Sequence, residues 1–253
     1  MATMAVLRDP EEAETRAIHE LVAFAGADVL EVGCGDGRLT WRYADRTRSV
    51  LALDPEAAAI EQARASLAHL PEQLRQTVTF QVADITSADL PSEVFDVIVL
   101  AWSLWCIAPE GVVNALNRMH TALRPGGHLL DLHPDALHAP VEVRLGDAIM
   151  PLGHLDQSRH IHDVHVARAA RQAAIDAGQF VLERETRFTF VMHFGTVESW
   201  LTYMAEHMHK DVVPADLVAR AHEVLPPGTA GEVRIPRQIY AARLRHGHPR
   251  PYA

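Results

Sequence analysis

The sequence is short of cysteine and of long apolar runs. Neither of its two cysteines, Cys34 and Cys106, belongs to a pair spaced for metal or redox chemistry, which argues against a disulfide framework and fits a reducing compartment. No run approaches the roughly 18 apolar residues of a membrane helix, and the first residues lack the basic start and apolar stretch of a signal peptide. We therefore expect a soluble, cytoplasmic protein without a membrane partner.

Positive charge is also scarce. The 253 residues include 23 Lys and Arg against 33 Asp and Glu, which gives a net charge of −10 with histidine neutral. A nucleic-acid surface requires clustered Lys and Arg, so we expect no nucleic-acid partner. Apolar residues make up 48% of the chain, enough for a substantial core. Because no linker, repeat or low-complexity tract interrupts the sequence, we expect a single domain over residues 1–253.

Segments of strand and helix character alternate over the first 133 residues. Short apolar runs predict strands at 28–33, 49–54, 78–84, 95–102 and 128–133. Helical spacing and caps predict helices between them, at 9–26, 36–46, 55–70 and 109–123. The run "FDVIVLAW" is almost wholly apolar, as is typical of a strand covered on both faces. The alternation predicts a parallel, doubly wound α/β sheet whose core spans residues 28–133.

The second half of the chain, residues 134–253, changes in character. Residues 134–163 have weak periodicity and several prolines, so we expect them to be loop-rich. Beyond them we expect helices at 164–178, 196–208 and 214–225 and strands at 180–194 and 232–245. These segments would supply substrate-side insertions and the last two strands.

Glycine recurs at every second position in "VLEVGCGDG", as Gly33, Gly35 and Gly37. The three residues fall where a strand gives way to the next helical segment. Glycine at such a point permits positive φ and lets the backbone approach a ligand closely. In an open α/β sheet, ligands bind beyond the carboxyl ends of the strands. The spacing alone is weak evidence, because similar runs occur by chance and in other nucleotide sites.

Two kinds of ligand compete for this loop. A dinucleotide site usually has the pattern G-x-G-x-x-G, but Arg38 stands where the third glycine would be. A pyrophosphate would also lie close to Glu31 and Asp36, which Coulomb repulsion disfavours. A positively charged ligand without phosphate suits an acidic loop better. S-adenosylmethionine, which carries an ammonium and a sulfonium, is such a ligand.

Residues 28–133 resemble the class I S-adenosylmethionine-dependent methyltransferases, in particular the small-molecule (type 11-like) branch. The resemblance extends over "LEVGCGDG", "LALD", "VADI", "FDVIVLAWSLWCI" and "LRPGGHLLDL", and the joint match is far more specific than any one motif. It implies a Rossmann-like sheet of seven strands in the order 3-2-1-4-5-7-6, with the last strand antiparallel. It also implies S-adenosyl-L-methionine as methyl donor and S-adenosyl-L-homocysteine as product.

The resemblance also assigns cofactor roles to particular residues. Asp54 would accept hydrogen bonds from both ribose hydroxyls, as a carboxylate can. Asp84 would bind the adenine amino group, and Ile85 would pack near the ring. The other residues implied in cofactor binding are Glu31, Gly33, Cys34, Gly35, Gly37, Pro55, Ala101, Trp102 and Trp105. Structural alternatives stay open: Asp54 could cap the helix that begins at Pro55, and Asp84 could be a turn residue.

Catalysis has a weaker signature. Methyl transfer from a sulfonium is an in-line displacement that gains much from alignment alone, although an oxygen or nitrogen acceptor can also require a general base. The candidates are His133 and His193, each near the end of a strand expected to point at the pocket. A hydrogen-bonded structural histidine is the alternative for both. The family often has histidine where this sequence has Trp105, which suggests an aromatic wall there.

Histidine is abundant, and 14 of the 16 histidines lie from His120 onward. The segment 154–165 contains "HIHDVH", where His162 and His165 would share a helix face. Such spacings are common in His-rich chains, so we predict no metal. Whether this segment is a lid stays open.

These observations predict an enzyme, an S-adenosylmethionine-dependent methyltransferase (EC 2.1.1.-) that methylates an O, N or C atom of a small molecule, and a homodimer is possible. One rival is a nicotinamide-dependent oxidoreductase, which the missing third glycine disfavours. Another is a methyltransferase-like binding protein without catalysis, since fold does not settle function. A nucleic-acid methyltransferase is disfavoured by the acidic charge and by the lack of an Asn-Pro-Pro-Tyr-like motif.

Overall fold

The computed structural model describes residues 6–135, 139–208 and 210–248. The chain divides into two compact units, which we describe separately. The core unit comprises Thr15–His133, Asp163–Thr186 and Tyr240–Ala253. The accessory unit comprises Met1–Glu14, Pro134–His162 and Arg187–Ile239. In the described part of the chain, no helix is both long and apolar enough to cross a membrane.

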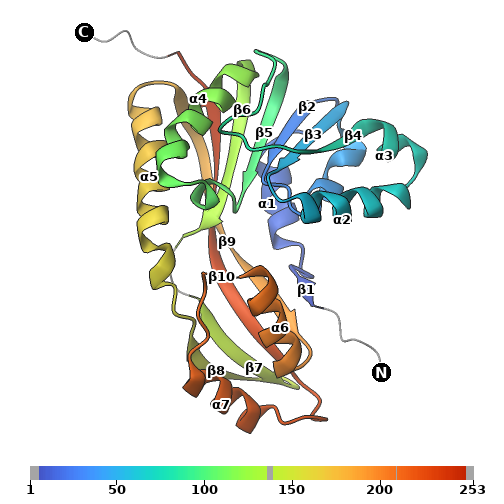
Figure 1. Ribbon diagram of the computed structural model, residues 1–253, viewed down its shortest axis with the longest axis vertical. Helices are drawn as coiled ribbons and strands as arrows, with labels where there is room; N and C mark the ends of the chain where they lie inside the picture. The colour runs from blue at the N-terminus through green and yellow to red at the C-terminus, as the bar shows by residue number, and fades with distance from the viewer. Residues whose placement is uncertain (1–5, 136–138, 209, 249–253) are drawn as a thin grey trace. The chain divides into compact units, whose positions relative to one another are not determined.

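The core unit is built on a sheet with parallel central strands. Its first five strands are β2 (Asp28–Val32), β3 (Ser49–Asp54), β4 (Val78–Val82), β5 (Phe95–Ala101) and β6 (Leu123–Pro134). The pairs β2–β3, β3–β4, β2–β5 and β5–β6 are all parallel, and Figure 1 shows these strands side by side between helices. Every residue of β2 is buried, as expected of a strand covered on both faces. The α/β class with parallel core strands is confirmed.

Two long strands, β9 (Phe180–Phe194) and β10 (Glu232–His246), run through both units. In the core unit they extend the sheet beyond β6, which gives the order β9-β10-β6-β5-β2-β3-β4. The expected strands at 180–194 and 232–245 are therefore present. Most of the first half of β9 is exposed, whereas its last five residues are buried.

Helices α2 (Ala57–Ala68), α3 (Glu72–Thr77), α4 (Val112–Ala122) and most of α5 (Ile161–Asp176) belong to the core unit. Helix α4 shows why such segments fold as they do. Val112, Ala115, Leu116 and Met119 are all buried, and their spacing of three and four residues puts them on one helix face. Helix α1 (Ala13–Leu21) begins where the Asp9 carboxylate accepts hydrogen bonds from the first backbone amides.

The helix expected at 36–46 does not form. Two short 3-10 turns stand there instead, at Thr40–Arg42 and Ala44–Arg46. The Thr40 and Tyr43 side chains are fully buried, and both hydroxyls donate to the Glu31 carboxylate. We attribute the broken helix to this demand, because two buried hydroxyls must converge on one carboxylate from positions three residues apart.

The accessory unit contains β1 (Leu7–Arg8), β7 (Pro140–Leu145), β8 (Ala148–His154), α6 (Val197–His207) and α7 (Ala215–Val224), with parts of β9 and β10. The pairs β1–β9, β7–β10 and β7–β8 are antiparallel. Thr196 caps α6 by accepting a hydrogen bond from the Ser199 amide at 3.0 Å, so the helix expected at 196–208 is confirmed.

The expectation that residues 134–163 are loop-rich is wrong. Strands β7 and β8 form a hairpin in which Leu145 pairs with Ala148 across a Gly-Asp turn. Gly146 has a φ of +57°, which such two-residue turns require. Val141 and Val143 are fully buried on one face of β7. The alternation in "VEVRL" and the turn dipeptide that follows it are typical of a hairpin. The nearby prolines led us to predict a loop instead.

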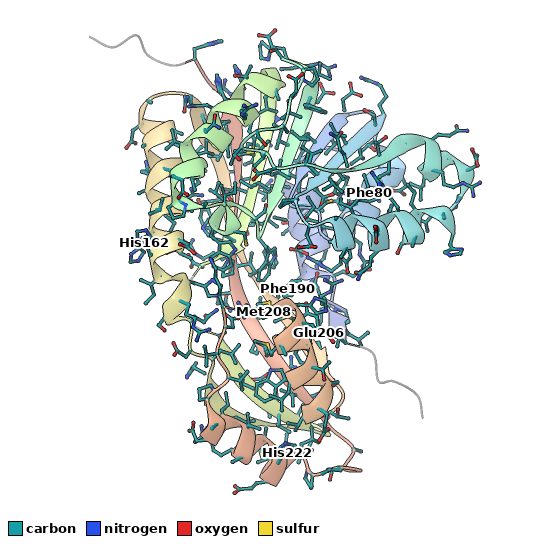
Figure 2. The ribbon with its side chains drawn as sticks, viewed as in Figure 1. Phe80, His162, Phe190, Glu206, Met208 and His222 are labelled. Carbon is teal, nitrogen blue, oxygen red and sulfur yellow. The ribbon has the colours of Figure 1, made fainter. Side chains whose placement is uncertain are left out.

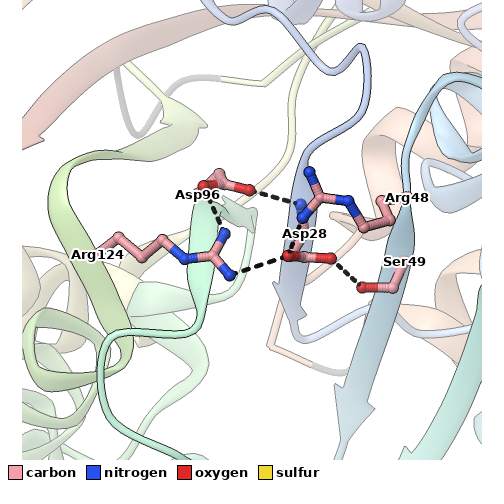
Figure 3. Close-up of polar contacts among 5 residues, drawn as sticks. All are labelled: Asp28, Arg48, Ser49, Asp96 and Arg124. Atoms are coloured by element: carbon pink, nitrogen blue, oxygen red, sulfur yellow. Dashed lines mark hydrogen bonds and ion pairs between the residues drawn. The ribbon is translucent and has the colours of Figure 1, made fainter.

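A polar network ties the amino-terminal ends of the core strands together (Figure 3). The Asp28 carboxylate accepts from Arg48 at 2.6 Å, Ser49 at 2.7 Å and Arg124 at 3.0 Å. Asp96 accepts from the Asp28 amide at 2.8 Å and from Arg124 at 2.6 Å. Burial alone would raise the pKa of Asp28, but Ser49 and the two arginines outweigh it and lower the pKa. This network joins β2, β3, β5 and β6 at one edge of the sheet.

The accessory unit has its own buried ion cluster. The Asp211 and Arg237 side chains are almost completely buried and form a direct ion pair. His160 and Gln157 approach the other Asp211 oxygen at 2.7 Å and 3.0 Å. Burial works against ionisation of Asp211, yet these hydrogen bonds and the arginine charge lower its pKa to about 2. The cluster fixes the segments around Asp156 and Val212, which form a β-bridge.

Removing one charge of this cluster should destabilise the fold. We expect Asp211→Ala to lower the free energy of unfolding by about 3–5 kcal/mol, because Arg237 is left as an uncompensated buried charge. The matched control is Asp216→Ala, whose partner Arg220 forms an exposed pair; its loss should cost less than about 1 kcal/mol. Urea denaturation followed by circular dichroism measures both. Equal effects of the two substitutions would contradict the prediction.

Candidate cofactor and acceptor site

The glycine loop follows β2 at the carboxyl edge of the core sheet. The backbone amides of Gly33 and Cys34 both donate to the Leu53 carbonyl of β3, at 2.8 and 3.0 Å. Gly33 has a φ of +76°, and a Cβ atom there would stand 2.4 Å from the Cβ of Ser103. The loop therefore lies against the segment that follows β5, and only glycine permits that approach.

Asp54 joins the end of β3 to this loop. One carboxylate oxygen accepts a hydrogen bond from the Gly35 amide at 2.8 Å, and the other accepts from the Glu56 amide at 2.9 Å. Helix α2 begins just beyond, with Glu56 as its N-cap, and Pro55 between them is exposed. Asp54 therefore contributes to the start of α2, as the capping alternative for this residue expected, although Glu56 is the N-cap itself. Each oxygen keeps a lone pair that a ligand hydroxyl can use.

Glu31 lies beneath the loop and is almost completely buried. One of its carboxylate oxygens accepts from the Thr40 hydroxyl at 2.5 Å and from the Tyr43 hydroxyl at 2.6 Å. Burial, followed by the Glu31 charge, raises the pKa of Tyr43 well above its usual value, so the phenol stays a donor. The chain itself therefore supplies partners for this buried carboxylate.

Cys34 is buried in the same loop. Burial raises the pKa of its thiol far above the usual range, and the charges of Glu31 and Asp54 act in the same direction. The thiol therefore stays neutral, and a neutral thiol is a poor nucleophile. The geometry fits a small packing residue.

Gly37 closes the loop beside two aromatic rings. A Cβ atom there would meet Phe80 and Trp41 at 3.0 Å, and these two rings pack edge to face. Phe80 comes from β4 and is labelled in Figure 2. The loop is thus held between β3 and an aromatic pair.

Asp84 and Ile85 follow β4 at the same edge of the sheet. Asp84 is exposed, and one of its oxygens accepts from the amide and the hydroxyl of Thr86, both at 2.8 Å. This is the turn geometry that stood as the alternative for Asp84, and its second oxygen is left for a ligand. Ile85 is buried beside it.

The segment after β5 is strained. Trp102 has a φ of +62°, which is a sterically costly conformation for a bulky residue. Strained residues cluster at active sites and ligand clamps. Its carbonyl accepts from the Trp105 indole at 2.7 Å, and its amide donates to the Leu132 carbonyl of β6 at 2.7 Å. Ala101, the last residue of β5, precedes this turn. Trp105 is largely buried, consistent with an aromatic wall.

A small cavity of about 10 Å³, with room for about one water molecule, lies at the carboxyl ends of β5 and β6 in the core unit. Its lining residues are Leu104, Trp105, Asp131, His133, Val164, Ala167, Arg168 and Arg171. His133 Nδ1 stands 3.2 Å from an oxygen of the buried Asp131, and the same oxygen accepts from Arg171 at 3.0 Å. His133 also packs on the Tyr240 ring, with centroids 5.1 Å apart.

Asp131 and Arg171 were not among the residues predicted from the sequence. Asp131 and His133 are two residues apart on one strand, so their side chains share a face of the sheet. The pattern "LLDLH" therefore contained a usable signal for Asp131. Arg171 comes from α5, a helix distant in sequence, and no local pattern connects it with β6.

His193 belongs to the accessory unit, on β9. Its Nδ1 lies 2.9 Å from Glu232 and its Nε2 lies 2.9 Å from Glu11. Each ring nitrogen therefore already has a carboxylate partner, which favours a structural role over that of a general base.

The His-rich segment 154–165 covers the end of β8 and the start of α5. His160 is engaged by Asp211, whereas His162 and His165 are exposed. Figure 2 shows His162 pointing outward from α5. Within residues 6–135, 139–208 and 210–248, no group of three or more His, Cys, Asp or Glu side chains could hold a metal ion.

Comparison with known proteins identifies the glycine loop. A family model described as "Methyltransferase domain" matches residues 29–127. Phosphoethanolamine N-methyltransferase 1 of Triticum aestivum is 33% identical over 111 residues, covering 43% of this chain and 22% of the relative. A tRNA N(3)-cytidine methyltransferase of Bos taurus is 30% identical over 132 residues, covering 47% and 35%. The matches thus span only a fifth to about a third of these two relatives.

The fold also has solved counterparts. The YcgJ protein of Bacillus subtilis superimposes with a TM-score of 0.59 at 15% sequence identity, over 92% of this chain and 97% of that one. At this identity the likeness concerns the fold alone. The family match shows that residues 29–127 resemble a methyltransferase domain, and the solved counterpart shows a Rossmann-like fold. The resemblance inferred from the motifs is confirmed.

The close contact at Gly33 generates a test. Gly33→Ala should destabilise the fold by about 2–4 kcal/mol, because it adds a clash with Ser103 to the strain of a left-handed backbone. Gly35→Ala is the matched control: its φ is +55° but its Cβ would meet open space, so only the strain of about 1–2 kcal/mol remains. Chemical denaturation compares the two. A larger loss for Gly35→Ala would refute this account of the loop.

Proposed function

We propose that the whole protein is a methyltransferase that uses S-adenosylmethionine to methylate an O, N or C atom of a small molecule. The observation that carries this proposal is the hydrogen bond between Asp54 and the Gly35 amide. It sets an acidic carboxylate and a glycine loop beside each other at the carboxyl edge of a parallel sheet, where such folds bind ligands. When bound, the cofactor supplies an activated methyl group.

The residues around the loop fit the parts of this cofactor. Asp54 has lone pairs for the ribose hydroxyls, and the second oxygen of Asp84 would accept from the adenine amino group. Buried Ile85 would pack near the ring. Glu31, already satisfied by two hydroxyls, would contribute negative charge near the ammonium. The remaining cofactor-binding residues proposed are Gly33, Cys34, Gly35, Gly37, Pro55, Ala101, Trp102 and Trp105.

The acceptor is proposed to lie beside Trp105 and His133, at the carboxyl ends of β5 and β6. The two sites are connected within the core unit, since Gly33 contacts Ser103 and the Trp105 indole donates to Trp102. His133 is the better candidate for a general base than His193. Its Nδ1 faces Asp131, and Nε2 makes no hydrogen bond within the described chain.

A small acceptor fits better than a nucleic acid. By their names, one relative acts on tRNA and another on phosphoethanolamine. Sequence similarity alone therefore does not distinguish a nucleic-acid acceptor from a small one. The net charge of −10 favours the small molecule, because a polyanion would be repelled. The order β9-β10-β6-β5-β2-β3-β4 supports the proposal that these seven strands constitute the family's 3-2-1-4-5-7-6 sheet with its last strand antiparallel. We propose that both units serve one enzyme, which can act as a homodimer.

Calorimetric titration tests the cofactor assignment. Wild-type protein should bind S-adenosylhomocysteine and S-adenosylmethionine and should not bind NAD, which separates the proposal from an oxidoreductase. Asp54→Ala should weaken binding by about 1–3 kcal/mol, because it removes the ribose contacts and loosens Gly35. Asp89→Ala, which changes an exposed carboxylate after β4, is the control and should bind like wild type. Unchanged affinity in Asp54→Ala would sink the assignment.

The two histidines are separated by kinetics. With methyl-labelled cofactor and an acceptor found by screening, His133→Gln should lower kcat by about 10²–10⁴-fold while cofactor affinity stays the same. His193→Gln should leave kcat near the wild-type value. A loss confined to His193→Gln would reverse the two roles, and wild-type rates in both variants would leave alignment as the main source of catalysis. Absence of turnover with every acceptor, despite cofactor binding, would favour a non-catalytic relative.

A further inference from the structure

We propose that the core unit has a second ligand site, for a small organic anion, in a cavity at the amino-terminal edge of its sheet. The cavity measures about 370 Å³, which lies within the usual size range of small-molecule pockets. Asp96 and Val97 line it near the start of β5, and Arg124 lines it near the start of β6. The cofactor and the acceptor are proposed at the opposite ends of these strands, so this site goes beyond the proposed function.

A bulge in β6 forms one side of the cavity. His128 pairs with Val97, but residues 124–127 stand out from the ladder opposite Asp96. Gly126, within this bulge, has a φ of +83°, and a Cβ atom there would meet nothing within 4 Å. Bulges re-aim side chains and are common at sheet edges and beside binding sites. The bulge therefore stands beside open space at the edge of the sheet.

Arg124 is the first residue of this bulge. Its guanidinium lies between two carboxylates, donating to Asp96 at 2.6 Å and to Asp28 at 3.0 Å (Figure 3). A guanidinium has five N–H groups, so these two contacts leave donors for a ligand. The Arg124 side chain is 35% exposed, so a ligand in the cavity can reach it.

Arg243 lines the cavity from β10. It donates to the Leu21 carbonyl at 3.1 Å and lies 3.2 Å from a Glu183 oxygen. The Glu183 carboxylate also accepts from Arg245 at 2.7 Å and stands 3.4 Å from His128, another lining residue. One carboxylate is thus shared by two arginines and a histidine.

Positive charge exceeds negative charge around the cavity. The two groups of ion pairs contain four arginines and three carboxylates, namely Arg48, Arg124, Arg243, Arg245, Asp28, Asp96 and Glu183. Burial and the charge of Arg243 lower the pKa of His128, and the opposing effect of Glu183 does not outweigh them. The imidazole therefore stays neutral at pH 7 and adds a polar group without charge. A local excess of positive charge, in a chain whose net charge is −10, favours an anion.

The rest of the lining is apolar or is glycine. Val22 and Ala23 follow α1, and Pro125 belongs to the bulge in β6. The planar guanidinium matches both carboxylate and phosphate groups, and a hydrocarbon body would replace water against the apolar lining. A lone inorganic ion would leave most of this volume to water. We therefore expect a molecule with one anionic group on a small apolar body.

Calorimetric titration of the full chain with phenyl phosphate and with benzoate tests the site. The probes share an aromatic ring, so their relative affinity shows whether a phosphate ester or a carboxylate is preferred. We expect at least one to bind saturably. Benzyl alcohol, which is neutral, should bind more weakly by about tenfold or more. Failure of both anions to bind, or equally tight binding of benzyl alcohol, would overturn the proposal.

Arginine variants locate the binding. Arg243→Gln should weaken binding of the preferred probe by about tenfold or more, because a charge-assisted hydrogen bond is lost. Arg245→Gln is the matched control. It removes the same charge and an ion pair to the same Glu183, but Arg245 lies outside the lining, so its effect should be smaller. Equal losses in the two variants would contradict the assignment.

Variants of Ala23 leave every ion pair intact. Ala23 is exposed and lines the cavity, so Ala23→Glu should repel the anion and weaken its binding by about tenfold. Ala23→Lys should bind at least as tightly as wild type. Ala25→Glu adds the same negative charge at an exposed position outside the lining and should bind like wild type. Equal affinity of Ala23→Glu and Ala23→Lys would refute the site even if the arginine variants fail to fold.

Competition separates this site from the cofactor loop. Saturating S-adenosylhomocysteine should leave the affinity for the probe unchanged, because the two sites lie at opposite edges of the core sheet. Displacement of the probe would place it in the cofactor loop and overturn the inference. If S-adenosylhomocysteine does not bind, the proposed function fails, and the variants of Ala23 and Arg243 still decide the anion site.

Discussion

The hydrogen bond from the Gly35 amide to Asp54 is the contact on which the rest of the site depends. It fixes a loop whose backbone angles only glycine adopts without strain to the end of the neighbouring strand. Because Gly33 packs on Ser103, the fixed loop in turn positions the segment after β5. That segment carries Trp105, which we propose as a wall of the acceptor site. A single carboxylate thus relates the cofactor loop to the place where an acceptor can lie.

Much of this could be predicted because it is local. Short apolar runs, each followed by glycine or an acidic residue, predict the parallel core strands. They also predict the glycine loop and the acidic ends of β3 and β4. What failed depends on distant partners. The 3-10 turns at 40–46 exist because Thr40 and Tyr43 must reach Glu31. The β7–β8 hairpin lies against β10, a strand some ninety residues further along the chain. Arg171 meets Asp131 across forty residues.

His133 and His193 show the same limit from another side. The two histidines have similar sequence contexts, because each lies near the end of a strand and follows an apolar residue. Their surroundings separate them. His193 has a carboxylate on each ring nitrogen, one of them from a segment near the amino terminus. His133 has a carboxylate on one nitrogen only, two residues away on its own strand. Whether a histidine nitrogen can act as a base depends on the groups that contact it. When those groups are distant in sequence, a local sequence pattern does not reveal them.

The two edges of the core sheet differ in how their carboxylates are satisfied. At the amino-terminal edge, Asp28 accepts three hydrogen bonds, from two arginines and a hydroxyl. At the carboxyl edge, Asp54 and Asp84 keep free lone pairs, and Asp131 has a buried oxygen with no partner in the described chain. A buried acceptor without a partner costs stability, and among these carboxylates only the Asp131 oxygen at the carboxyl edge is of that kind.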